Sequence, residues 1–260
     1  MRVVAVDWSG RRNGQARAIW LAEARGDALV RLEGGRTRAE VVDHLIDLAT
    51  RDPDIVVGFD FSFSLPEWFL IERGYATVDA LWDAAAREGE HWLRDCAPPF
   101  WGRPGRPRPE SPAHWRVTED AIAHHVPGIR PKSTFQIGGA GSVGTGSIRG
   151  FPELARLRRA GFAIWPFDEA RAPCALEVWP RTCTGAVVKS DPVARARLLD
   201  ERFPLLDAAI RAHAVASDDA FDAAITALVM SARLDTVATL RILERPPHPQ
   251  AVLEGWVWMP

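Results

Sequence analysis

Short runs of apolar residues alternate along this chain with segments of helical periodicity. Residues 2–8 form an apolar, β-branched run closed by a Ser-Gly pair, which predicts a buried strand that ends in a turn. Residues 15–23 and 28–32 predict two further strands, joined by a tight Arg-Gly-Asp turn. Connections this short favour an antiparallel meander, because a parallel crossover needs a dozen or more residues.

The next segments add a helix and a second buried strand. A helix is expected over residues 38–50, because Thr37 can cap it and Glu40 stands where a capping box needs an acid. The apolar run at 55–61 predicts a strand. Later strands are expected at 162–166 and 174–179, and later helices at 78–94, 192–201, 205–214 and 217–233, with a short helix that starts at Pro152 and ends at Ala160.

This order of elements predicts an α/β fold with a mixed sheet, its first three strands antiparallel, and helices on both faces. It is the order of the ribonuclease H-like fold, whereas a doubly wound fold would begin strand, helix, strand. We expect residues 1–64 and 150–260 to form the core. Residues 65–149, where helical stretches alternate with Pro-, Gly- and Arg-rich segments, are expected to form a large helical and loop insertion or lid subdomain.

Composition narrows the class of protein. With 260 residues, 47% of them hydrophobic and 25% charged, the chain is globular. It has no uncharged apolar run near the roughly 20 residues of a membrane helix, so we expect a cytoplasmic protein with no membrane partner. The three cysteines form no CxxC pair and predict reduced thiols rather than a zinc site.

The distribution of charge along the chain is compatible with an anionic partner that binds at a local basic surface. The formal net charge of −2 excludes a chain that holds nucleic acid by its overall field. Two windows, residues 101–116 and 149–159, nevertheless each carry four arginines against one glutamate. The Trp and Arg residues of 92–116 could form a lid that stacks on and contacts single strands; the alternative is tryptophan packed under a Pro-rich loop.

Carboxylates occupy positions where strands and helices ordinarily bury apolar side chains. They lie at the end of the first strand, on the fourth strand, inside a later strand and on the last long helix: Asp7, Asp60, Glu177, and the group Asp218, Asp219 and Asp222. Asp218 and Asp222 are one helical turn apart, on a face that continues through apolar residues toward the core.

If the last helix packs over the first and fourth strands, Asp7, Asp60 and Asp222 meet near the strand ends. Two such charges 4 Å apart repel by ~4 kcal/mol at an effective dielectric constant of 20. Mg²⁺ or Mn²⁺ would neutralise them through oxygen ligands, and a pair of these ions can clamp the two oxygens of a phosphodiester. The pattern therefore predicts a metal-dependent hydrolase that acts on nucleic acid or another phosphodiester.

Several of these acids also have a structural interpretation, although a buried strand seldom keeps an unpaired carboxylate such as Asp60. Asp218 or Asp219 in a first helical turn behind Ser217 would compensate the helix dipole. Asp7 before Ser9 and Gly10 could form a turn. Glu177 could pair with an arginine such as Arg181.

Four segments together resemble the domain of unknown function 429 family, whose members are predicted to belong to the ribonuclease H-like superfamily. They are residues 4–10 (VAVDWSG), 57–66 (VGFDFSFSLP), 175–180 (ALEVWP) and 218–224 (DDAFDAA). The resemblance implies a ribonuclease H-like core and a metal-dependent nuclease. Carried onto this sequence, it implies catalytic and metal-binding roles for Asp7, Asp60, Glu177 and Asp222, with Asp218 or Asp219 auxiliary. Asp60 and Glu177 are alternatives for the third metal ligand.

The glycine-rich run at 138–147 could offer backbone amides to a phosphate, or it could be a flexible hinge. It lacks the GxxxxGK[ST] pattern, because its nearest lysine precedes it. The weaker candidates for substrate contact are Lys132, Gly139, Gly141 and Arg149. Two other functions stay open: a nucleotide-binding phosphotransferase of the actin-like or sugar-kinase type, and a non-catalytic binding module of the same fold.

Overall fold

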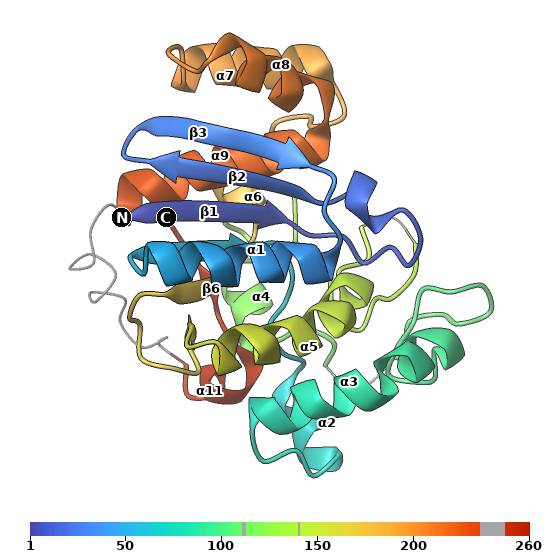
Figure 1. Cartoon of the computed structure of the whole chain (residues 1–260). Coiled ribbons are helices and arrows are strands. Elements are labelled where there is room, and N and C mark those ends of the chain that lie inside the picture. The colour runs from blue at the N-terminus through green and yellow to red at the C-terminus, as the bar shows by residue number, and fades with distance from the viewer. Residues whose placement is uncertain (111–112, 140, 235–247) are drawn as a thin grey trace.

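The computed structural model describes residues 1–110, 113–139, 141–234 and 248–260, and within them a mixed sheet of seven strands organises the fold (Figure 1). The order across the sheet is β3-β2-β1-β4-β6-β5, and β7 also pairs with β6. The pairs β1–β2 and β2–β3 are antiparallel, whereas β4 runs parallel to both β1 and β6. The strands are β1 (Arg2–Asp7), β2 (Trp20–Arg25), β3 (Ala28–Gly34), β4 (Ile55–Phe59), β5 (Ala163–Ile164), β6 (Cys174–Val178) and β7 (Val257–Trp258). The expected mixed sheet with an antiparallel start is confirmed.

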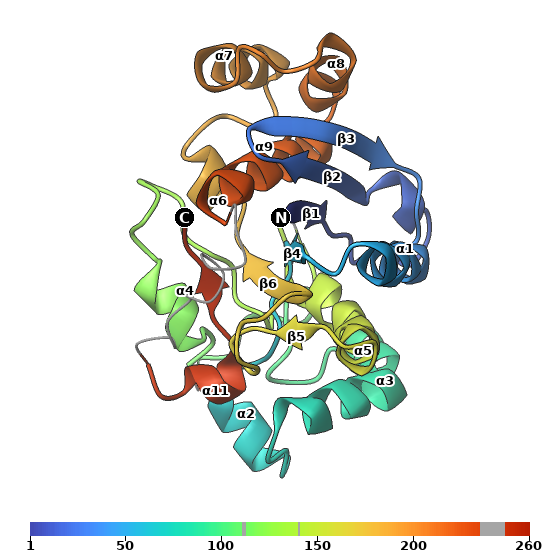
Figure 2. The ribbon, with the colours of Figure 1, turned by 60° about the vertical axis from the view of Figure 1, so that its left-hand side comes forward.

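Helices cover both faces of this sheet. Figure 2 shows α1 and α5 on one side and α9 on the other, with α7 and α8 beyond the β3 edge. The helices are α1 (Arg38–Arg51), α2 (Glu67–Glu72), α3 (Val78–Asp95), α4 (Val117–Ala121), α5 (Gly144–Arg159), α6 (Arg181–Thr184), α7 (Pro192–Arg202), α8 (Ala208–Ala216), α9 (Asp218–Arg233) and α11 (Ala251–Glu254), with a 3-10 turn η1 (Gln15–Arg17). None of the described helices is long and apolar enough to cross a membrane.

Side-chain alternation along the central strands decides which residues meet which helix layer. Val4 and Val6 of β1 point into the cluster that contains the buried face of α1. Val3 and Ala5 point to the opposite side, where α9 packs. Asp7 continues this second series, so the strand geometry alone turns its side chain toward the α9 layer.

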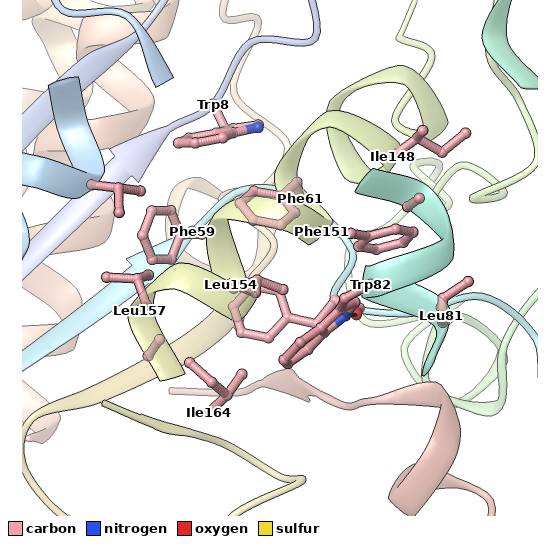
Figure 3. Packing of buried hydrophobic residues seen from close by; sticks show 14 of the residues in the cluster. Trp8, Phe59, Phe61, Leu81, Trp82, Ile148, Phe151, Leu154, Leu157 and Ile164 are labelled. Carbon is pink, nitrogen blue, oxygen red and sulfur yellow. Dashed lines mark hydrogen bonds between the residues drawn. The ribbon is translucent and has the colours of Figure 1, made fainter. Parts of the chain in front are cut away.

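Aromatic side chains fill the core between the sheet and α5. Trp8 lies 4.9 Å from Phe61 and 5.6 Å from Phe59 between ring centroids, and Phe151 and Trp82 pack farther along the same cluster (Figure 3). Trp82 Nε1 donates a hydrogen bond of 2.9 Å to the carbonyl of Phe63, which satisfies its polar atom in the apolar interior.

The helix expected to start at Pro152 instead begins at Gly144, so Pro152 lies inside α5. The second half of the glycine-rich run thus forms a helix rather than a loop. Close packing explains the glycines: a Cβ on Gly150 would lie 2.4 Å from Phe61 Cε2, and one on Gly144 would lie 2.2 Å from the carbonyl oxygen of Thr134. At these positions glycine is required because the helix backbone packs directly against neighbouring atoms. The local sequence does not distinguish this role of glycine from its role in turns.

Several other boundaries differ from the sequence expectation. The strand expected over 55–61 ends at Phe59, so Asp60 directly follows β4, and β5 and α8 are shifted or shortened by a few residues. The segment expected as a strand over 15–23 splits into η1 and β2, and the boundary proposed between 149 and 150 falls inside α5. Buried residues of 65–149, such as Leu81 and Phe135, belong to the same cluster as β1 and β4. Cys96, Cys174 and Cys183 are free and buried.

Candidate functional site

Asp7 and Asp60 stand side by side at the ends of neighbouring parallel strands. Val6 of β1 is in register with Phe59 of β4, so the residues that follow them are neighbours. The backbone N–H of Asp60 donates to the carbonyl of Val6 at 3.1 Å, which extends the pairing by one residue. Because the strands are in register, both carboxylates leave the sheet on the α9 side.

Helix α9 supplies the third carboxylate. Ser217 caps the helix by accepting a hydrogen bond from the N–H of Ala220, and Asp222 follows one turn later on the buried face. The helix lies close to the sheet because Gly58 has no side chain: a Cβ there would lie 2.5 Å from Met230 Sδ. Asp7 is 8% exposed and Asp222 is 5% exposed, so this contact holds two carboxylates almost out of water.

The three acids act on one another electrostatically. Burial raises the pKa of Asp7 well above its ordinary value, and the charges of Asp60 and Asp222 raise it further. Burial and then Asp222 raise the pKa of Asp60 to about 7. Burial also raises the pKa of Asp222, against the opposing effect of Lys189. The three carboxylates, expected to converge on the basis of sequence, do lie within range of strong mutual repulsion.

Lys189 provides the cation that faces this cluster. Its Nζ donates to Asp222 Oδ2 in an ion pair between two largely buried side chains. Asp222 Oδ1 is buried and has no hydrogen-bond partner. A buried carboxylate oxygen without a donor is costly, so the structure leaves at this position an acceptor that a cation or a donor group would satisfy.

Glu177 faces the other side of the sheet. Its neighbours on β6, Leu176 and Val178, point to the α9 layer, so alternation sends the Glu177 side chain away from it. There it accepts hydrogen bonds of 2.9 Å from the N–H of Phe63 and from Arg116 Nη1. The arginine suggested for this role was Arg181, which instead donates to backbone carbonyls.

Arg116 is fully buried and joins two glutamates. Its guanidinium forms ion pairs with Glu119 and Glu177, and Nη1 also donates to the carbonyl of Glu254 at 2.8 Å. Burial raises the pKa of Glu119 to about 7, against the lowering effect of Arg116. Glu177 therefore belongs to a structural ion network, although its charge still contributes to the raised pKa of Asp60.

The remaining acids of α9 lie at its beginning. Asp218 is exposed and Asp219 is half-buried. Burial and the neighbouring Asp218 raise the pKa of Asp219, whose charge in turn raises that of Asp7. Asp219 thus borders the cluster, whereas Asp218 has the exposed first-turn position of a residue that compensates the helix dipole.

An open pocket of about 410 Å³ adjoins the acids, and Asp60 forms part of its wall. A second, much smaller space is lined by Asp7, Asp60 and Asp222, so Asp60 borders both spaces. Aromatic side chains line the open pocket, and so do four cationic residues: Trp8, Phe61 and Trp179, with Arg130, Lys132, Arg181 and Lys189. The acids in its lining are Asp60, Glu119 and Glu177. Cationic and anionic groups in one pocket suit a ligand that is itself anionic and is held beside a cation.

Comparison with known families adds one finding. The model of the family described as "Protein of unknown function (DUF429)" matches residues 6–246. The chain belongs to the DUF429 family. No curated protein and no solved structure matches it, so the relationship to the ribonuclease H-like superfamily stays a prediction.

Sequence reasoning missed Lys189, although the DUF429 chain carries a signal that points to it. The sequence contains 32 basic residues, of which Lys132 and Lys189 are the lysines. Both line the pocket. Where a chain otherwise uses arginine throughout, two lysines on one pocket mark positions that suit a compact, flexible ammonium group.

The weaker substrate candidates separate into two groups. Lys132 and Gly141 line the pocket, as proposed for a phosphate contact, whereas Gly139 is exposed outside it. Arg149 forms an ion pair with Glu90 and donates to the carbonyl of Gly10, so it joins α5 to α3 and to the turn after β1. The guanidinium group of Arg149 is therefore used in structural contacts.

The fit of a metal ion depends on donor chemistry and on position. Carboxylate oxygens are the ligands that Mg²⁺ and Mn²⁺ take, and the free Oδ1 of Asp222 is such a donor. Among residues 1–110, 113–139, 141–234 and 248–260, no three His, Cys, Asp or Glu side chains converge closely enough to hold an ion. The oxygen donors thus suit a hard cation by their chemistry but do not converge on one point in the described residues, and the ammonium of Lys189 is the charge that such a cation would replace at Asp222.

Proposed function

We propose that this DUF429 protein is a divalent-metal-dependent hydrolase of phosphodiester bonds, with nucleic acid as its substrate class. The observation that carries the proposal is that β1, β4 and α9 bring three mutually repelling carboxylates together, one of which, Asp60, also lines a pocket with cationic walls. Folding alone does not favour such a cluster, because each acid would be more stable in water. A divalent cation bound between them would relieve their repulsion.

Asp7, Asp60 and Asp222 would hold Mg²⁺ or Mn²⁺, with Asp219 beside them. When bound, the metal would lower the pKa of a water molecule and stabilise charge on the phosphate. Lys132 and Arg130 on the pocket wall would bind the nonbridging phosphate oxygens. Asp60, which reaches both the acid cluster and the open pocket, would accept a proton from the attacking water.

Lys189 would act as the counter-ion of Asp222 when no metal is bound. Its flexible side chain pairs with Asp222 and also lines the pocket, so it can turn toward a substrate phosphate when Asp222 binds a cation. Glu177 would act indirectly by fixing Arg116 and the backbone at Phe63. A cytoplasmic location remains part of the proposal.

The direct test is hydrolysis of bis(p-nitrophenyl) phosphate and of labelled oligonucleotides in Mn²⁺, Mg²⁺ or EDTA. We expect metal-dependent cleavage that Asp7→Asn and Asp222→Asn each reduce at least a hundredfold. Asp47→Asn, an exposed acid on α1, is the control. Cleavage that survives both site substitutions would refute the assignment.

One observation favours a second function. Because Lys189 already neutralises part of Asp222, the acids could be structural in a non-catalytic binding module. Absence of any thermal stabilisation by Mn²⁺ or Mg²⁺ would favour that module. Stabilisation by ATP with Mg²⁺, but not by Mg²⁺ alone, would favour the phosphotransferase alternative.

A further inference from the structure

The loop after α3 carries three exposed arginines, Arg103, Arg106 and Arg108, and it projects from the body of the molecule in Figure 1. Within the described residues, none of the three forms an ion pair. The other arginine-rich window behaves differently, because Arg156 and Arg158 each pair with two acids. In that window Arg149 also forms an ion pair, with Glu90, and only Arg159 forms none with any described residue, so three successive arginines without ion pairs distinguish this loop.

Backbone contacts fix this loop against the segment that leads to the pocket. Trp101 donates to the carbonyl of Phe135 at 3.0 Å and accepts from the N–H of Ile137 at 2.9 Å. Gly102 and Gly138 then touch directly: a Cβ on Gly102 would lie 2.4 Å from the carbonyl oxygen of Gly138. The loop is therefore anchored beside Gly138, close in sequence to Gly141 and Ser142, which line the pocket.

Trp115 joins the loop to the cationic pocket wall. Arg108 lies 5.6 Å from the Trp115 ring centroid and Arg130 lies 4.5 Å from it, so the two guanidinium groups share one indole. Trp115 Nε1 also donates to the carbonyl of Pro131, next to Lys132. Arg130 also forms an exposed ion pair of 2.6 Å with Asp120. Cationic side chains thus continue from the pocket, through the paired Arg130 and through Lys132, to the arginine loop.

We propose that this surface, formed by Arg103, Arg106, Arg108, Arg130 and Lys132, binds the backbone of a single-stranded nucleic acid whose reacting nucleotide enters the pocket. The inference rests on the proposed function and names its substrate class. Cations that extend beyond the pocket require a ligand with several successive phosphates rather than a mononucleotide.

The shape of the pocket favours a single strand over a duplex. A space of about 410 Å³ with aromatic side chains on its walls suits one nucleotide unit, not paired strands. Bases become available to such a pocket when they are unstacked, as they are in single strands. DNA and RNA share this chemistry, so both serve as probes.

The test is fluorescence anisotropy of labelled 20-nucleotide DNA and RNA in EDTA, where no hydrolysis occurs. We expect Arg103→Gln/Arg106→Gln/Arg108→Gln to weaken binding at least tenfold. The slope of log affinity against log salt should fall by about 2, because each lost phosphate contact on a single strand contributes about 0.7. The control variant, Arg51→Gln/Arg197→Gln/Arg211→Gln, removes the same charge from exposed ion pairs elsewhere and should change affinity less than twofold.

A second readout uses Lys132. Acetylation of Lys132, followed by mass spectrometry, should slow at least threefold when the strand is bound. Absence of binding by the unaltered protein, equal weakening by both triple variants, unprotected Lys132 or equal affinity for duplex would each overturn the inference. Hydrolysis of bis(p-nitrophenyl) phosphate in Mn²⁺ tests the proposed function separately, since that small diester does not span the surface.

Discussion

Lys189 and Asp222 form an ion pair that uses only one of the two oxygens of a buried carboxylate. Lys189 Nζ donates to Oδ2, whereas Oδ1 is buried without a partner. The arrangement neutralises one of three clustered acids and leaves an acceptor facing the same space. A cation that replaced the ammonium at Asp222 could use both carboxylate oxygens, so under the proposed function the two residues would link protein stability to metal binding.

We therefore expect Lys189→Met to lower the free energy of unfolding by about 1–3 kcal/mol at pH 8, because it leaves Asp222 charged, buried and unpaired. Lys189→Arg retains the charge and should lose less. Urea unfolding measures both. Mn²⁺ should raise the melting temperature of Lys189→Met by more than that of the unaltered protein. An unchanged free energy of unfolding in Lys189→Met would show that the ion pair contributes nothing to stability.

The pKa of Asp60 predicts a pH dependence of stability. Because burial and Asp222 raise this pKa to about 7, the folded state binds a proton that the unfolded state has released. The stability associated with Asp60 is complete below its ordinary pKa near 4 and is lost as the pH rises through about 7.

Asp60→Asn removes this ionisation. Between pH 5 and pH 8 the variant should gain about 1–2 kcal/mol relative to the unaltered protein, because the coupled acids share the effect. Chemical unfolding at several pH values measures the difference, with Asp47→Asn as the control. Parallel pH profiles for Asp60→Asn and the unaltered protein would contradict the shifted pKa.

Glu177 and Asp222 should respond differently to metal. Glu177→Gln removes one partner of the buried Arg116 and should cost about 1–3 kcal/mol in the free energy of unfolding. It should still show a rise in melting temperature with Mn²⁺, because Glu177 leaves the sheet on the face opposite α9. Asp222→Asn should abolish that rise. Loss of the metal response in both variants would place Glu177 among the ligands.

Gly58 sets the distance between α9 and the sheet. In Gly58→Ala the new methyl group would lie 2.5 Å from Met230 Sδ and 2.9 Å from Val178 Cγ1, so we expect a loss of about 1–3 kcal/mol. Met230→Ala should relieve part of this clash. In a double-mutant cycle the combined variant should therefore lose at least about 1 kcal/mol less than the sum of the single losses. Strict additivity would mean that the helix accommodates the methyl group without displacement.

The local pattern of apolar and polar residues in the sequence predicted the sheet, most of the helices and the identity of the central acids. The apolar runs that end at Asp7 and contain Asp60 became β1 and β4, and the Thr37 capping box formed as expected at the start of α1. These features depend on neighbours a few residues away in the chain, so periodicity and capping signals report them. The proximity of Asp222 to Asp7 and Asp60 followed from its position on the helical face that packs against the core.

Tertiary structure decided what each charged group contacts. Glu177 meets Arg116, which is 61 residues away in sequence, and Asp222 meets Lys189, which is 33 residues away. The glycines at 144 and 150 serve packing against Thr134 and Phe61 rather than a loop. Which cations remain unpaired, as in the arginine loop, depends on where every acid of the folded chain lies. Charge and close packing act through space, so their partners are set only when distant segments have come together.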